Sequence, residues 1–119
     1  MSYRSFEDLD VWKESCRLAV SIHELFKESR DYAMRDQISR SSISVPSNIA
    51  EGCERGSEKD TIRFLHIAKG SCAEVRTQLY LSIKMKIVDH EAATVLLDDT
   101  KKISSKLQNL IKSLSDRIF

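Results

Sequence analysis

Hydrophobic residues recur at intervals of three and four along nearly the whole chain, with polar residues between them. This spacing is typical of helices that bury one face. It divides the chain into four segments: residues 5–28, a second from 32 or 34 to 51, a third that begins at Ser57, and a fourth from 89 to about 116. Because short polar links join the segments, we predict an all-α fold, an antiparallel up-and-down four-helix bundle.

The inward face of each helix follows from the same spacing. In the first segment, the predicted seam is Leu9, Trp12, Cys16, Ala19, His23 and Phe26. In the third, it is Ile62, Leu65, Ala68, Cys72, Val75 and Leu79. In the fourth, it is Leu96, Ile103, Leu107, Leu110, Ile111 and Leu114. The third segment also has an apolar row off its seam, so it should contact two neighbours or another subunit; this row is Phe64, Ile67 and Leu81.

The second segment contains Pro46, the one proline of the chain. A proline costs about 3 kcal/mol in a helix interior, because it lacks a backbone donor and crowds the preceding turn. Ile38, Val45 and Ile49 nevertheless keep helical spacing across it, so we predict one helix, bent at Pro46 and closed by Gly52. Nearby serine hydroxyls can donate to carbonyls that the bend leaves free; they belong to Ser41, Ser42, Ser44 and Ser47.

The short link between the second and third segments predicts how these helices pair. Positions whose numbers add to about 112 should lie side by side. Gly70 and Ser71 would then face Ser41 and Ser42. Such small residues would let the two helices approach closely and would hold the bend beside Pro46 in place.

Two pairs of opposite charges follow from the same arrangement. The predicted register brings Arg40 towards Glu74, on a face otherwise lined by small and apolar groups. Each charge would be costly there alone, so we expect a partly buried salt bridge between them. Glu51 and Arg55, four residues apart at the end of the second helix, form a lesser candidate pair.

The composition limits the class of protein. The chain has 119 residues, 41% of them hydrophobic and 31% charged, which suits a single domain over residues 1–119. It has no apolar run of the roughly 20 residues that span a bilayer, and no secretory signal, so we expect a cytoplasmic protein without a membrane partner. Its three cysteines match neither a disulfide framework nor a zinc pattern. We expect them to be reduced, with Cys16 and Cys72 as small core residues.

The net charge of +1 gives no overall attraction to nucleic acid or to a membrane. The last third of the chain is mildly basic. Its lysines are candidate nucleic-acid contacts along one phosphate-facing stripe; these candidates are Lys84, Lys86, Lys101, Lys102 and Lys106. Lysine on the outer face of a helix is usually only solvated, and we favour that interpretation.

The residues around the proline form the main candidate for a chemical site. Helical spacing brings its members to one side: Arg40, Pro46, Ser47, Asn48, Glu51 and Glu74. No histidine lies on the same helix to activate a serine, and the chain has neither a glycine-rich phosphate loop nor metal-ligand spacing. We therefore favour a structural role and expect no enzyme activity, cofactor, metal or small-molecule substrate.

Four stretches of the chain resemble a known family. They are FEDLDVWK (residues 6–13), DQISRSSISVPSNIAEG (36–52), Arg55 with Ser57, and FLHIAKGSCAEV (64–75). In order and spacing, they are similar to the 23S ribosomal RNA intervening-sequence proteins, and the likeness covers nearly the whole chain. The resemblance implies a short helical bundle that forms ring-like homo-oligomers, commonly pentamers.

The same family is similar to the accessory variability proteins of diversity-generating retroelements. Those proteins are strongly basic rings that bind nucleic acid and a reverse transcriptase. This chain is nearly neutral, so nucleic-acid binding is not carried over from them. The resemblance supplies no catalytic residues. It does mark a structural motif, namely Arg40, Pro46, Ser47, Asn48, Glu51, Gly52, Gly70 and Glu74.

Three functions therefore stand as hypotheses. The first is a non-enzymatic homo-oligomeric scaffold or adaptor that binds a protein or nucleic-acid partner. The second is RNA or DNA binding through the basic last helix of an assembled ring, which would multiply a small charge excess. The third, an enzyme or small-molecule binder at the cluster around Pro46, ranks last.

Overall fold

The computed structural model describes residues 5–118 and is all-helical over that range. A single 3₁₀ turn, η1 (Phe6–Asp8), precedes four α-helices. These are α1 (Asp10–Phe26), α2 (Tyr32–Cys53), α3 (Glu58–Lys84) and α4 (His90–Ile118). The prediction of a four-helix, all-α fold is confirmed.

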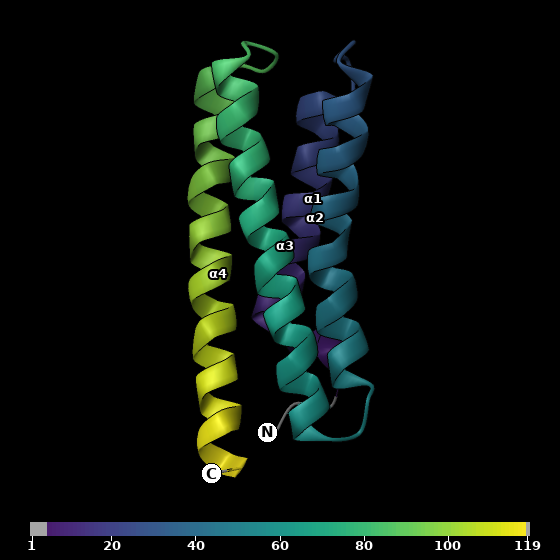
Figure 1. The fold of residues 1–119 in the computed structure, drawn as a ribbon, viewed down its shortest axis with the longest axis vertical. Coiled ribbons are helices and arrows are strands. Elements are labelled where there is room, and N and C mark those ends of the chain that lie inside the picture. Colours follow the sequence, from purple (N-terminus) through teal and green to yellow (C-terminus); the bar gives the residue numbers. More distant parts are fainter. Residues whose placement is uncertain (1–4, 119) are drawn as a thin grey trace.

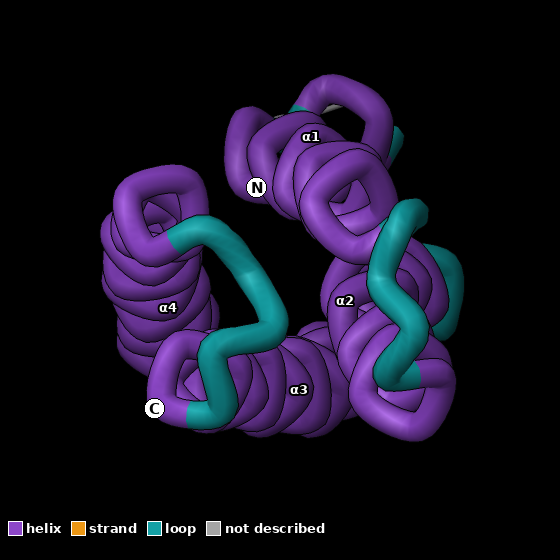
Figure 2. Tube along the Cα trace, turned by 90° about the horizontal axis from the view of Figure 1, so that it is seen from above, coloured by secondary structure: helices purple, strands orange, loops and turns teal. Residues whose placement is uncertain are grey.

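The helices form an up-and-down bundle that measures 46 × 19 × 19 Å along its principal axes (Figure 1). Seen from above, α1, α2, α3 and α4 follow one another round the bundle (Figure 2). The α2–α3 pair has the most extensive contact and the α1–α4 pair the least. Among residues 5–118, no helix is both long and apolar enough to cross a membrane.

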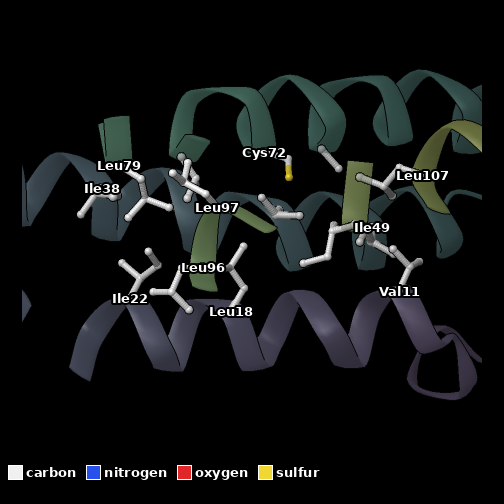
Figure 3. Packing of buried hydrophobic residues seen from close by; sticks show 14 of the residues in the cluster. Val11, Leu18, Ile22, Ile38, Ile49, Cys72, Leu79, Leu96, Leu97 and Leu107 are labelled. Carbon is white, nitrogen blue, oxygen red and sulfur yellow. The ribbon is translucent and has the colours of Figure 1, made fainter. Parts of the chain in front are cut away.

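Aliphatic side chains from all four helices meet in one core (Figure 3). Each fully buried Leu, Ile or Val contributes about 1.5–3 kcal/mol through removal from water. The largest of these buried side chains are Phe26, Leu18, Ile22, Ile38, Ile49, Leu65, Leu79, Ile103, Leu107 and Leu114. The predicted seams of α3 and α4 contribute most of their members to this core.

The predicted seam of α1 is correct at Phe26, but from Trp12 to His23 it lies one position away from the buried row. The buried residues are Val11, Ser15, Leu18, Ile22 and Phe26. His23 is exposed, and Cys16 is only half-buried. Both rows satisfy helical spacing, since α1 carries apolar residues over a wide arc, and the pattern alone does not say which row faces the other three helices.

Trp12 accordingly lies at the margin of the core and not inside it. Its side chain is half-buried and packs against the core cluster from outside. The Phe6 ring meets it edge-on, with centroids 5.2 Å apart and planes at 69°. Such an edge-to-face pair is worth about 0.5–1.5 kcal/mol beyond its buried area. The tryptophan therefore anchors η1 to α1.

Helix α2 continues across Pro46, which is buried. The hydroxyls of Ser41 and Ser42 donate to the carbonyls of Gln37 and Ser39, at 3.1 and 3.0 Å. Both hydroxyls therefore find their hydrogen-bond acceptors within α2, as short polar side chains commonly do in helices. The bend at Pro46 stays a prediction.

The register of α2 against α3 differs from the predicted one. Ser71 meets Ser44, and not Ser41, with their Oγ atoms 2.8 Å apart. Nearer the turn, the Thr61 hydroxyl donates to the Gly52 carbonyl at 2.8 Å. The positions of this contact add to 113, close to the prediction, whereas Ser44 and Ser71 add to 115, so the departure from the predicted register is found away from the turn.

The roles predicted for two glycines are also wrong. Gly52 does not end α2, which runs on to Cys53; it is the point of close approach, where an added Cβ would lie 2.8 Å from Phe64 Cβ. Gly70 is exposed, and a Cβ there would meet nothing within 4 Å. The turn glycine is Gly56, whose φ of +86° falls in the left-handed region that favours glycine.

Candidate functional site on the α2–α3 face

Most of the predicted motif residues lie on the surface. Arg40, Ser47, Glu51, Gly70 and Glu74 are all exposed. They share their side of the α2–α3 pair with three exposed apolar side chains. We call this surface the α2–α3 face; it comprises Arg40, Ile43, Ser47, Glu51, Ile67, Gly70, Glu74 and Leu81.

The contact between Ser44 and Ser71 places the two rows of this face side by side. Residues three and four positions apart are neighbours on a helix surface. Arg40 and Ser47 therefore flank Ser44 on α2, and Ile67 and Glu74 flank Ser71 on α3. Since Ser44 and Ser71 hydrogen-bond to each other, the rows that flank them line the two sides of one surface.

A chain of hydrogen bonds lies directly beneath the face. The Asn48 amide donates to the Ser44 carbonyl at 2.8 Å and to the Ser44 hydroxyl at 2.9 Å. Because the Ser44 oxygen accepts from Asn48, its own proton is available to Ser71. Asn48 thus holds the Ser44 hydroxyl in place from within α2, and the bond between Ser44 and Ser71 joins the two helices.

The predicted salt bridge between Arg40 and Glu74 is not formed. Both residues are exposed, and the Arg40 guanidinium donates to Gln37 Oε1 at 3.3 Å. The prediction assumed a small, apolar and partly buried environment, but water reaches both charges, so neither requires a partner. The lesser pair is confirmed, since Arg55 Nη1 lies 3.8 Å from Glu51 Oε1.

The face is bounded at the turn by a stack of cations on an aromatic ring. The guanidinium carbons of Arg55 and Arg63 lie 4.8 and 4.6 Å from the centroid of the Phe64 ring. Exposed cation–π contacts of this kind are worth about 0.5–1 kcal/mol each. They fix Phe64 over Gly52 and order this end of the face.

Two kinds of reactive group can be assessed directly in the described residues, namely metal-ligand clusters and the buried Cys72 thiol. No cluster of three or more potential metal ligands occurs in residues 5–118. Burial raises the pKa of the Cys72 thiol to about 11, and the thiol hydrogen-bonds to the Thr100 carbonyl at 3.3 Å. A nucleophilic cysteine needs the opposite shift.

The five candidate lysines lie in two separate places, one beside the α3–α4 contact and the other beside the α1–α4 contact. Lys84 and Lys101 line one hollow of about 390 Å³ between α3 and α4, together with His90 and Asp98. Exposed Lys86 lies in the adjoining turn.

The other two lysines face α1. Lys102 lines a hollow between α1 and α4, and Lys106 forms a salt bridge with Glu14 on α1. The five lysines therefore do not form one stripe.

A groove between α1 and α4 was not predicted from the sequence. It consists of two adjoining hollows that share Ser21. The charged hollow is lined by Glu14, Arg17, Leu18, Ser21, Asp99, Lys102 and Ile103. The apolar hollow is lined by Val20, Ser21, Glu24, Leu25, Ala92, Val95 and Leu96. The polar row of α1 at positions 14, 17, 21 and 24 has helical spacing and was the available signal.

Comparisons with known proteins agree with one another. Residues 7–109 match the model of the family described as 23S rRNA-intervening sequence protein. The chain is also similar to a crystal structure from Bacteroides thetaiotaomicron, a protein of unknown function from the S23 ribosomal protein family. That similarity has a TM-score of 0.81 at 30% identity and covers 86% of this chain and 98% of the other. No curated protein matches the chain.

Proposed function

The chain belongs to the 23S rRNA-intervening sequence protein family, and from this premise we propose that it is a non-enzymatic bundle that associates with copies of itself. The assembly serves in the cytoplasm as a scaffold or adaptor for a protein or nucleic-acid partner, with residues 1–119 acting as one domain. The observation that carries this proposal is the α2–α3 face, where large apolar side chains stay exposed beside polar ones.

The exposed fractions on this face favour a protein contact. Ile43, Ile67 and Leu81 are 55%, 42% and 43% exposed. Single exposed apolar residues are ordinary, but three on one surface, bordered by charged and small residues, have the composition of an interface core with a polar rim. A specific interface buries about 800 Å² on each partner, and one side of a bundle 46 Å long can supply that area.

A copy of this chain is the partner that the family resemblance favours. The resemblance implies ring-like assemblies, commonly pentamers, and a ring needs a surface on each subunit that is complementary to its neighbour. The proposal that the assembly is non-enzymatic is supported by the open surroundings of the motif residues, since catalytic groups act in water-excluded pockets where their pKa values are shifted.

A pair of variants tests the proposal. Ile67→Asp introduces a charge at the middle of the face, and Thr94→Asp introduces the same charge on the exposed side of α4 that adjoins α3. In sedimentation velocity at micromolar concentration, Ile67→Asp should shift the protein to the monomer, whereas Thr94→Asp should sediment like the parent chain. If both variants sediment like an oligomeric parent, the face is not the interface.

Nucleic-acid binding is the second candidate, favoured by one observation. Lys84 and Lys101 come from different helices yet line one hollow, with exposed Lys86 nearby. In a ring, such a basic corner would be repeated on every subunit.

Titration with ribosomal RNA fragments at two salt concentrations tests this second candidate. Each phosphate contact should steepen the salt dependence of binding by about one unit of slope. Lys84→Glu combined with Lys101→Glu should weaken binding, and binding that does not respond to salt or to these changes would exclude it.

A further inference from the structure

We infer that the self-association proposed above is head-to-tail, with α3 of one copy seated in the α1–α4 groove of the next copy. Glu74 of the seated helix lies against the basic rim of the groove, and one apolar neighbour of Glu74 fills the apolar hollow. The inference rests on the proposed self-association and adds the surface that receives the α2–α3 face.

In a single copy, the groove leaves apolar side chains exposed to water. Its charged hollow measures about 350 Å³ and its apolar hollow about 460 Å³. The apolar hollow is bordered by Val20 and Val95, which are 63% and 61% exposed. Burying both would contribute about 1.5–3 kcal/mol for each side chain that becomes fully covered.

The charged hollow also contains groups without partners. Arg17, Asp99 and Lys102 form no salt bridge or hydrogen bond with the rest of residues 5–118. The Oε2 atom of Glu14 is buried and has no hydrogen-bond partner, although Oε1 bonds to Lys106. A buried acceptor without a donor costs about 1–3 kcal/mol, so a donor from outside the chain would be favourable.

The acidic and the basic side chains of the charged hollow lie at different depths. Glu14 and Asp99 are half-buried, while Arg17 and Lys102 are exposed. The floor is therefore acidic and the rim basic. A complementary surface must present an acid to the rim and a cation or other donor that reaches inward.

The α2–α3 face offers both kinds of group. Glu74 has no salt bridge or hydrogen bond among the described residues, and the Arg40 guanidinium bonds only to Gln37. Placed over the groove, Glu74 would meet Arg17 and Lys102 on the rim. Arg40, on the neighbouring row, would be the donor directed at the acidic floor.

The spacing of the two surfaces matches along the helix axis. On α4, Val95 and Lys102 lie seven residues apart, which is about 10.5 Å along the helix. On α3, Glu74 lies seven residues after Ile67 and seven before Leu81. When Glu74 is opposite Lys102, either Ile67 or Leu81 is therefore opposite Val95, whichever way the seated helix runs.

Gly70 gives the seated helix room to approach. It lies on α3 between Ile67 and Glu74, and a Cβ there would meet nothing within 4 Å. Small residues on a contact face let helix axes come closer, which a groove between two helices requires. The close approach that sequence analysis assigned to Gly70 inside the bundle thus applies between copies.

The two surfaces lie on opposite sides of the bundle. Figure 2 shows the α1–α4 side across the bundle from the α2–α3 side. Each copy can therefore offer its α3 row to one neighbour and its groove to another, which makes the interface heterologous.

A mixing experiment tests this arrangement with two variants that each block one surface. Ile67→Asp combined with Leu81→Asp blocks the face whichever way the seated helix runs, and Val95→Asp blocks the groove; all three sites are exposed, so the fold should be retained, as circular dichroism checks. Each variant alone should be monomeric. Mixed in equal amounts, they should form a one-to-one complex in native mass spectrometry, because each supplies the surface that the other lacks.

A charge exchange tests the same contact within the full assembly. Glu74→Lys and Lys102→Glu should each weaken assembly at least tenfold, and the double variant should restore it. If Val95→Asp and Lys102→Glu assemble like the parent chain while the variant with both Ile67→Asp and Leu81→Asp does not, or if the mixture forms no complex, the groove is not the receiving surface, although self-association would stand. A parent chain that is itself monomeric would overturn the proposed function as well.

Discussion

Gly52 and Phe64 pack backbone against side chain where α2 and α3 leave their connecting turn. A methyl group added to Gly52 would lie 2.8 Å from Phe64 Cβ and 3.2 Å from the Thr61 carbonyl oxygen. Neither atom is at the end of a flexible side chain, so the helices would have to separate. This contact and the Thr61 hydrogen bond to the Gly52 carbonyl set the register that places the α2–α3 face.

We predict that Gly52→Ala lowers the free energy of unfolding by about 1–3 kcal/mol, because overpacking strains the helix pair by more than alanine gains in helix propensity. Gly70→Ala is the matched control. It fills open space on an exposed helix, so it should raise the free energy of unfolding by about 0.5–1 kcal/mol. Urea unfolding in the Ile67→Asp background separates folding from assembly. Equal effects of the two alanines would contradict the assignment.

The hydrogen bond between Ser44 and Ser71 should be measurable as a coupling. Ser44→Ala and Ser71→Ala should each cost about 0.5–1.5 kcal/mol, and the double variant should cost less than the two together, because the second change removes a group already left without its partner. A double-mutant cycle by urea unfolding gives the coupling energy. Additive effects would show that the two hydroxyls do not pair.

Trp12 and Phe26 should differ in their contribution to stability. Phe26 is 1% exposed in the core, whereas Trp12 lies at its margin against Phe6. Phe26→Ala should cost about 3–5 kcal/mol and Trp12→Ala about 1–2 kcal/mol. Urea unfolding followed by circular dichroism ranks the two; a larger cost at Trp12 would mean that the indole is the core residue.

Because the Cys72 thiol is buried, the free energy of unfolding should depend on pH in the alkaline range. Burial raises its pKa to about 11, from about 8.5 in an unfolded chain. The unfolded state therefore loses this proton first, so the stabilisation is complete below about pH 8.5 and is lost as the pH rises towards 11.

Cys72→Ala removes this titration while leaving every other group in place. Between pH 8 and 10.5, the parent chain should lose about 2 kcal/mol more unfolding free energy than Cys72→Ala does. If the unfolding free energies of the two chains fall in parallel as the pH rises, the pKa of the Cys72 thiol is not raised in the folded state.

The sequence was sufficient for the fold because the periodic spacing of Leu65, Val75 and Leu107 leaves one face of each helix to bury. It was insufficient where two faces of one helix are both plausible. On α1, the row through Leu18 and Ile22 and the row through Trp12 have the same period, and only the positions of the other helices distinguish them.

The sequence predicted which residues form the motif around Pro46, but it did not predict where they lie on the fold. The residues around Pro46 were identified, yet Arg40 and Glu74 were assigned to a partly buried bridge when both are exposed. That error came from the assumed burial, because Arg40 and Glu74 lie on the water-facing side of the helix pair, where neither charge requires a partner. The sequence did not predict the α1–α4 groove, because each hollow is lined by residues of two helices and the pattern on either helix alone indicates it only weakly.

The solution mass of the unmodified chain tests the central claim most directly. Light scattering coupled to size-exclusion chromatography at micromolar concentration should give a mass of two or more whole 13.6 kDa chains, since the α2–α3 face is complete only when a second copy covers it. A mass of 13.6 kDa throughout the micromolar range would contradict the account.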